Sequence, residues 1–248
     1  MLFSMRDLQG IQVNAQDAEI GPATDLLFDD GGWIVRYIVV EGEPWLPEQR
    51  VLVPAGELGR PDWNENRITV EATRDQIAGS PAVAREEPVS RQKEEQLHAH
   101  FGWQPYWTDA NPPPEGRISH VPEGEEMTGD RQDQSVPTDP APGGQHLRSA
   151  REVDGYHVEA NGGRSGVVAG FIIDDESWVI RYLVVDLGIE HDSRQVLLAA
   201  HLVDRVSFDQ FAVYIDIDAD RIAGGPEFDP SVPVNSEYEE VLRDYFGY

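Results

Sequence analysis

The chain has 248 residues, of which 40% are hydrophobic, and it carries a formal net charge of −27 with no cysteine. A chain this acidic should repel nucleic acid and anionic lipid headgroups, because binding to either depends on Lys and Arg. The absence of cysteine excludes disulfides, thiolate metal sites and thiol chemistry. No apolar run approaches the roughly 18 residues that a membrane-spanning helix needs, and residues 1–9 do not resemble an export signal, so we expect a cytoplasmic protein.

The N-terminal part of the chain predicts short strands. The segment Leu8–Val13 is short and half apolar, which is typical of a strand. A second strand is expected to begin at Gly21 and to end at the paired acids Asp29-Asp30. The glycines that follow these acids favour a tight hairpin into the next strand.

That next strand belongs to a stretch that occurs twice. Trp33–Val40 reads WIVRYIVV, and Trp178–Val185, 145 positions later, reads WVIRYLVV. The flanking sequence aligns at the same offset without a gap, so the chain contains two copies of one unit. We therefore predict a first domain over residues 1–107, a Pro- and Gly-rich acidic linker over 108–150 and a second domain over 151–248.

The repeated stretch is apolar on both faces, with Arg36 as its one charged residue in the first copy. A strand of this kind must be covered on both sides. We expect one face to fill the interior of a barrel and the other to pack against a helix or against the second copy. Short alternating runs then predict closing strands, at residues 49–53, 67–71, 195–198 and 212–216.

Each copy is expected to end in a helix. In the second copy, Asn235 or Ser236 can cap the helix, and Tyr238 and Val241 belong to its apolar stripe. The first copy has polar residues at the two stripe positions, Lys93 and Gln96. The second helix therefore has more apolar surface to bury than the first.

An aromatic segment follows the first helix. It contains three large rings in five residues, Trp103, Tyr106 and Trp107. Because such rings are costly to leave in water, we expect them to dock on a barrel.

Together, the glycine strand openings, the acidic turn before Trp33 or Trp178, the apolar strand and the segment Phe101–Trp107 resemble the PRC-barrel family. This family is named for the cytoplasmic domain of the photosynthetic reaction-centre H subunit, and it includes the C-terminal domain of the ribosome-maturation factor. The resemblance covers about residues 6–107 and 151–248. It implies a mainly β fold of two small SH3-like antiparallel barrels, each followed by a short α-helix, which serve as docking modules.

Four acidic residues have the spacing of a calcium-binding loop: Asp216, Asp218, Asp220 and Glu227. Arg221, however, stands where such a loop needs glycine, and the alternative is the solvent-exposed face of a strand end. We found no phosphate-binding, nucleophile or metalloprotease motif, so no cofactor and no catalytic residue is predicted.

Arg36 and Arg181 are candidate interface residues, because an arginine in an apolar strand must find a partner for its charge. The guanidinium group of each arginine can pair with a nearby carboxylate, or it can fix the register between the two units. Aromatic residues complete the expected interaction set: Trp33, Tyr37, Trp178, Tyr182, Trp103, Tyr106 and Trp107.

These features predict a non-enzymatic docking or scaffold protein, arranged as an internal pseudo-dimer that exists alone or as a homodimer. Its partner would be a protein, with the negative charge favouring a cationic one, and nucleic acid and direct membrane insertion are not expected. A ligand- or cation-responsive sensor that uses the acidic loops is the alternative. An enzyme would need a polar cleft between the two barrels.

Overall fold

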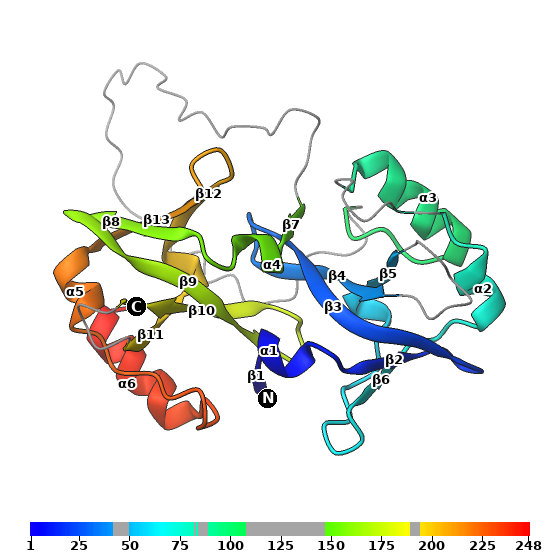
Figure 1. Ribbon diagram of the computed structural model, residues 1–248, viewed down its shortest axis with the longest axis horizontal. Coiled ribbons are helices and arrows are strands. Elements are labelled where there is room, and N and C mark those ends of the chain that lie inside the picture. The colour runs from blue at the N-terminus through cyan, green and yellow to red at the C-terminus, as the bar shows by residue number, and fades with distance from the viewer. Residues whose placement is uncertain (42–49, 82, 84–88, 108–146, 189–193) are drawn as a thin grey trace, which may run out of the picture.

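The computed structural model describes residues 1–41, 50–81, 83, 89–107, 147–188 and 194–248. Within these residues the chain is mainly β, with two curled sheets that correspond to the two copies (Figure 1). We call residues 1–107 the first half and residues 147–248 the second half. Most of the expected linker, residues 108–146, lies outside the described residues. None of the helices in the described part is long and apolar enough to cross a membrane.

The first half contains, in chain order, β1 Leu2–Ser4, α1 Met5–Leu8, β2 Gln12–Asn14, β3 Glu19–Asp29, β4 Ile34–Glu41, β5 Arg50–Pro54, the 3-10 helix η1 Ala55–Glu57, β6 Arg67–Thr69, α2 Arg74–Ala78 and α3 Arg91–Phe101. The second half contains β7 Leu147–Ser149, α4 Ala150–Val153, β8 His157–Asn161, β9 Gly163–Asp174, β10 Ile180–Asp186, β11 Gln195–Ala199, the 3-10 helix η3 Ala200–Leu202, β12 Val203–Ser207, β13 Ala212–Asp218, α5 Ala219–Ala223 and α6 Ser236–Phe246. The repeated stretch thus supplies β4 and β10. Residues 147–150, at the end of the expected linker, form β7 and the start of α4.

The strand predicted over Leu8–Val13 is wrong at its beginning. Leu8 ends α1, and β2 starts only at Gln12. A capping box explains the difference, because Ser4 and Asp7 satisfy each other's backbone N–H groups and so start a helix at Met5.

The helix predicted at the end of the second copy is confirmed as α6. Of the two possible caps, Asn235 is the one used, and its side chain accepts a hydrogen bond from the Tyr238 N–H. Gly247 ends the helix in the left-handed conformation.

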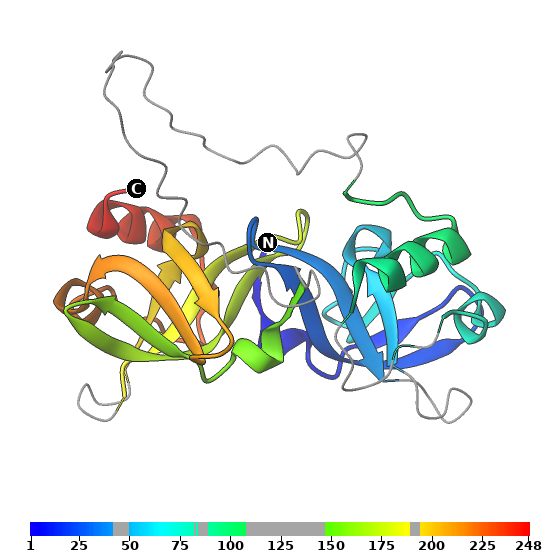
Figure 2. The same cartoon turned by 90° about the horizontal axis from the view of Figure 1, so that it is seen from above.

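The sheets have corresponding strand orders, β5-β4-β3-β2-β6 and β11-β10-β9-β8-β13-β12. Figure 2 shows how strongly both sheets curl. The expectation of purely antiparallel pairing is wrong for one pair in each sheet, because β2 runs parallel to β6 and β8 runs parallel to β13. In each half, this parallel pair joins an early strand, β2 or β8, to the last strand of that half, β6 or β13.

Gly166 permits the bend in β9. Its φ is +144°, and a Cβ atom there would clash with the Asp186 carbonyl oxygen, so a side chain cannot be accommodated. This glycine marks the point at which β9 passes from pairing with β8 to pairing with β10. Gly21, with φ +142°, has the equivalent place in β3.

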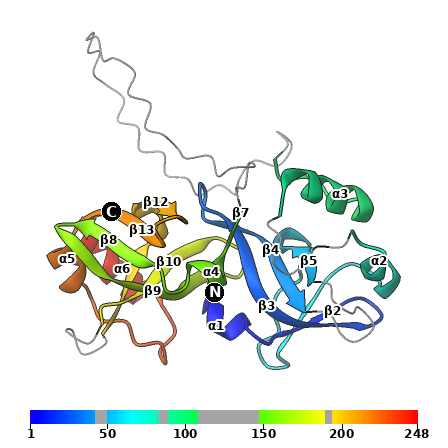
Figure 3. The same ribbon diagram turned by 45° about the horizontal axis from the view of Figure 1, so that its top comes forward.

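The two halves exchange their first strands. β1 of the first half pairs with β9 of the second, and β7 of the second half pairs with β3 of the first. The registers are equivalent: Phe3 lies opposite Ile173, and Arg148, 145 positions after Phe3, lies opposite Phe28. Figure 3 shows α1 and α4 close together at this seam, whereas α3 and α6 lie toward opposite ends of the molecule.

A direct bridge between β4 and the start of β10 completes the seam. Ile34 lies opposite Val179, its own equivalent in the other half. The Val35 N–H donates to the Trp178 carbonyl at 2.8 Å, and the Ile180 N–H donates to the Trp33 carbonyl at 2.7 Å. Such reciprocal contacts are typical of an isologous interface between two copies of a protein.

Among the described residues, one hydrophobic cluster runs through both halves. At the seam it is aromatic: Phe28 lies 5.7 Å from Phe171 and stacks on Trp33 at 5.2 Å, and Phe3 meets Trp178 edge-on at 5.9 Å. Each such ring buries a large apolar area. The two halves therefore share a core instead of each enclosing its own.

The expectation that β4 is covered on both faces is confirmed. Ile38 and Val40 join the shared core, whereas Tyr37 and Val39 belong to a smaller cluster that includes Leu97 of α3. The outer face of β4 is thus closed by the helix of its own half.

Candidate functional site

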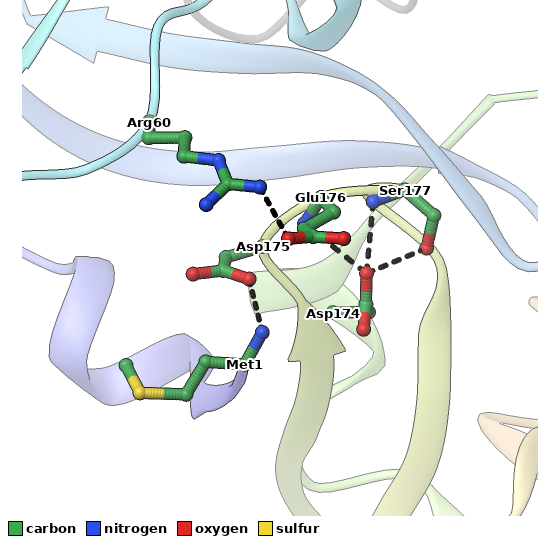
Figure 4. A network of polar contacts seen from close by, with 6 residues as sticks. All are labelled: Met1, Arg60, Asp174, Asp175, Glu176 and Ser177. Atoms are coloured by element: carbon green, nitrogen blue, oxygen red, sulfur yellow. Dashed lines mark hydrogen bonds and ion pairs between the residues drawn. The ribbon is translucent and has the colours of Figure 1, made fainter.

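Charged groups hold the hairpin turns of each half against the other half. Asp175 forms an ion pair with the N-terminal amino group of Met1, and Glu176 forms one with Arg60 (Figure 4). In the other turn, Asp30, the equivalent of Asp175, pairs with Arg148 at 2.6 Å. The seam is therefore an intramolecular interface with an aromatic interior and charged edges.

Trp33 and Trp178, two of the candidate interaction residues, lie at this seam between the halves. Both side chains are buried, and both residues have positive φ, 55° and 54°. A bulky residue rarely adopts this conformation, and here the packing and the two cross-seam hydrogen bonds hold it in place.

Arg36 and Arg181 pair with carboxylates of their own half and not with groups across the seam. The Arg36 guanidinium lies 3.1 Å from the Asp29 carboxylate and 4.0 Å from the centre of the Tyr106 ring, and its side chain is 15% exposed. Arg181 lies 3.9 Å from Glu239 and is 51% exposed. The aromatic segment after α3 therefore covers Arg36 but has no equivalent above Arg181 in the described structure.

Tyr37 and Tyr182 each anchor the helix of their own half. The Tyr37 hydroxyl donates to Glu94 of α3 at 3.1 Å, and the Tyr182 hydroxyl donates to Glu239 of α6 at 2.8 Å. Glu94 is fully buried, and it also accepts a hydrogen bond of 2.5 Å from Tyr106.

His98 completes the buried polar cluster beneath the aromatic segment. Its Nε2 lies 2.9 Å from the Tyr37 hydroxyl. Because Tyr37 donates its single hydroxyl hydrogen to Glu94, the imidazole Nε2 must donate to the hydroxyl oxygen. Trp103 and Trp107 pack edge-on against the imidazole ring, as expected for a docked aromatic segment.

Burial controls the protonation of this cluster. It raises the pKa of Tyr37 and of Tyr106, and the negative charge of Glu94 raises both further. Burial also lowers the pKa of His98, which keeps the imidazole neutral near neutral pH. Glu94 thus accepts hydrogen bonds from two tyrosine hydroxyls and pairs with Arg91 at 3.4 Å, and its bond to Tyr37 holds α3 on β4.

The acidic residues with calcium-loop spacing do not come together. Asp216 accepts a hydrogen bond of 2.8 Å from Asn161, and Glu227 lies next to β11, opposite Val196. In the part of the chain that the structure describes, no group of three or more His, Asp or Glu side chains could hold a metal ion.

A groove beside α6 is the site that sequence reasoning did not assign. Its volume is about 350 Å³, and Phe228, Val232, Tyr238 and Val241 form much of its apolar lining. Val232 is 55% exposed and Val241 is 50% exposed, among the most exposed large apolar residues described. The sequence indicated the groove only through the helix, where Tyr238 and Val241 are apolar and the first copy has the polar residues Lys93 and Gln96.

Hydrogen bonds connect the walls of the groove. The Tyr238 hydroxyl donates to the Glu227 carbonyl at 2.9 Å, which ties α6 to the segment before it. The Phe228 N–H donates to the Gln195 carbonyl at 2.7 Å, which ties that segment to β11. These two hydrogen bonds connect α6, the segment before it and β11 around the groove.

Three exposed carboxylates also line the groove, and we call them its rim: Glu227, Asp229 and Glu237. Hydrogen bonds from the Ser231 hydroxyl and N–H lower the pKa of Asp229, so that its carboxylate is ionised near neutral pH. The lining of the groove thus combines apolar side chains, which we call its floor, with negatively charged groups.

The chain matches no protein-family model and no curated protein.

Proposed function

We propose that the chain is a cytoplasmic, non-enzymatic docking or scaffold protein, built from two SH3-like barrels of the PRC type that pack as an internal pseudo-dimer. The strand orders, the reciprocal strand exchange and the helix after each sheet support this architecture. The barrel that the second curled sheet forms carries the groove beside α6, and this groove is the site to which a partner protein docks.

The exposed apolar lining of the groove is the observation that carries this function. Soluble proteins rarely leave clustered apolar side chains in water unless a partner covers them. The first copy does not keep these side chains, since Lys93 and Gln96 stand at the positions of Tyr238 and Val241. The seam between the halves, by contrast, is filled by aromatic rings, which argues against a substrate cleft there.

Photo-crosslinking tests the docking function. A photoreactive amino acid at position 241 should join the chain to a defined partner in an extract of the native host, and the same group at position 211 should not. Phe211 is a suitable control because it is 61% exposed and lies outside the groove.

The captured protein must then bind the purified chain directly. A double variant, Val232→Ser with Val241→Gln, should lose that binding while keeping its unfolding midpoint. Equal crosslinking from both positions, or undiminished binding by the double variant, would contradict docking at the groove.

A further inference from the structure

We infer that the groove beside α6 receives a segment of the partner in which one apolar side chain is flanked by lysine or arginine. This inference rests on the proposed docking function and adds the chemistry of the ligand. The apolar floor provides the site for the anchoring side chain, and the three rim carboxylates provide the sites for the flanking cations.

The size and shape of the groove fit a short segment. A volume of about 350 Å³ is at the lower end of the range that small ligands occupy, so it takes one anchor side chain and its neighbours, not a folded domain. The Tyr238 hydroxyl already donates to the backbone of the wall, which leaves the ring as an apolar surface. Specificity must then come mainly from the rim.

The charge of the rim selects the occupant. Glu227, Asp229 and Glu237 stand on a chain whose net charge is −27, and the field of such a surface attracts cations and repels acidic segments. Residues 108–146 of the same chain are themselves acidic, with eight Asp or Glu against two Arg, so they do not match the rim. A second copy of this acidic chain is disfavoured for the same reason.

A set of four synthetic dodecapeptides, measured by fluorescence anisotropy with the full-length chain, tests the inference. The first peptide is built from leucine and lysine, with each leucine next to a lysine. In the second and third, serine or glutamate replaces the lysine, and in the fourth, serine replaces the leucine. We expect the leucine–lysine peptide to bind at least ten-fold more tightly than each of the others at an ionic strength of about 0.15 M.

Two sets of variants assign the binding to the groove. Val232→Ser with Val241→Gln should weaken the leucine–lysine peptide at least ten-fold, whereas Phe211→Asn should leave it unchanged. Asn suits position 211 because it tolerates the positive φ of 48° found there. Neutralising the rim, with Glu227→Gln, Asp229→Asn and Glu237→Gln together, should weaken binding and flatten its dependence on salt.

The outcomes separate the inference from the docking function. If the leucine–serine or leucine–glutamate peptide binds as well as the leucine–lysine peptide, and the groove variant abolishes that binding, the docking function stands and the charge preference is overturned. If the serine–lysine peptide binds equally and the groove variants change nothing, the attraction is a general effect of the acidic surface and the inference fails. Failure of all four peptides also overturns it, while crosslinking at position 241 still decides the docking function.

Discussion

The Tyr37 hydroxyl donates a hydrogen bond of 3.1 Å to Glu94, although the two residues come from β4 and α3 and lie 57 positions apart. Tyr182 and Glu239 repeat this contact in the second half. The surroundings differ, since Glu94 is fully buried and the Glu239 side chain is 22% exposed. One contact thus occurs in a buried and in a partly exposed form within one molecule.

Removing the two hydroxyl groups should therefore have unequal effects. Tyr37→Phe takes one donor from a buried carboxylate and a partner from His98, which we expect to cost about 1–3 kcal/mol of unfolding free energy. Tyr182→Phe should cost about 1 kcal/mol or less, because water can reach Glu239. Urea denaturation of the full chain measures both, and equal losses would contradict the assigned difference in burial.

His98 should make the stability of the protein sensitive to acid. Burial lowers its pKa below the ordinary value of 6.5, and the positive charge of Arg91 acts in the same direction, more than offsetting the backbone hydrogen bonds and Glu94. The unfolded chain then binds more protons than the folded chain, so this contribution is present above about pH 6.5 and is lost as the pH falls through the folded-state pKa.

The measurement is the unfolding free energy between pH 5 and pH 8. His98→Gln, which keeps a donor toward Tyr37, should flatten the curve on its acidic side. His201→Gln is a comparison variant and not an unshifted control, since burial also lowers the pKa of His201. If the His98 variant and the wild type gave parallel curves, the neutral buried imidazole would be ruled out.

Much of the architecture could be predicted because it depends on local patterns. The repeat of Trp33–Val40, its two apolar faces and the glycine at the start of each long strand indicate paired sheets, and α6 follows from its cap and its stripe. These signals can be read from the sequence because apolar side chains repeat every few residues along a strand or a helix.

The exchange of β1 and β7 could not be predicted. Each strand has three residues, too few to show a period, and the sheet that such a strand joins is decided by packing across the seam. The burial of Glu94 was hidden for a related reason, since its donor Tyr37 lies far away in the chain. For the groove, the stripe of Tyr238 and Val241 was visible in the sequence, but its incomplete burial was not.

The two strand arginines should differ in their effect on stability. Arg36→Ala removes a largely buried ion pair with Asp29 and a stacking contact with Tyr106, which we expect to cost about 1–2 kcal/mol. Arg181→Ala removes a long, half-exposed contact and should change stability by less than about 0.5 kcal/mol.

Neither arginine variant should alter the association state, because both pairs lie within one half. Denaturation together with size-exclusion chromatography checks this. A shifted elution volume for either variant would favour the hypothesis that these arginines fix the register between units.

Phe3 tests whether the halves fold as one body. It belongs to β1 of the first half, yet it packs against Trp178 of the second half as well as Trp63, with ring centres 5.9 Å and 5.0 Å apart. Phe3→Ala should cost about 3–5 kcal/mol, the usual effect of removing a buried ring. Because the core runs through both halves, we expect hydrogen exchange at low denaturant to accelerate in β4 and in β10 together.

Val241→Ala, at a half-exposed position of α6, is the control and should stay within about 0.5 kcal/mol of the wild type. Faster exchange in one half alone would mean that the shared core divides into two independent folding units.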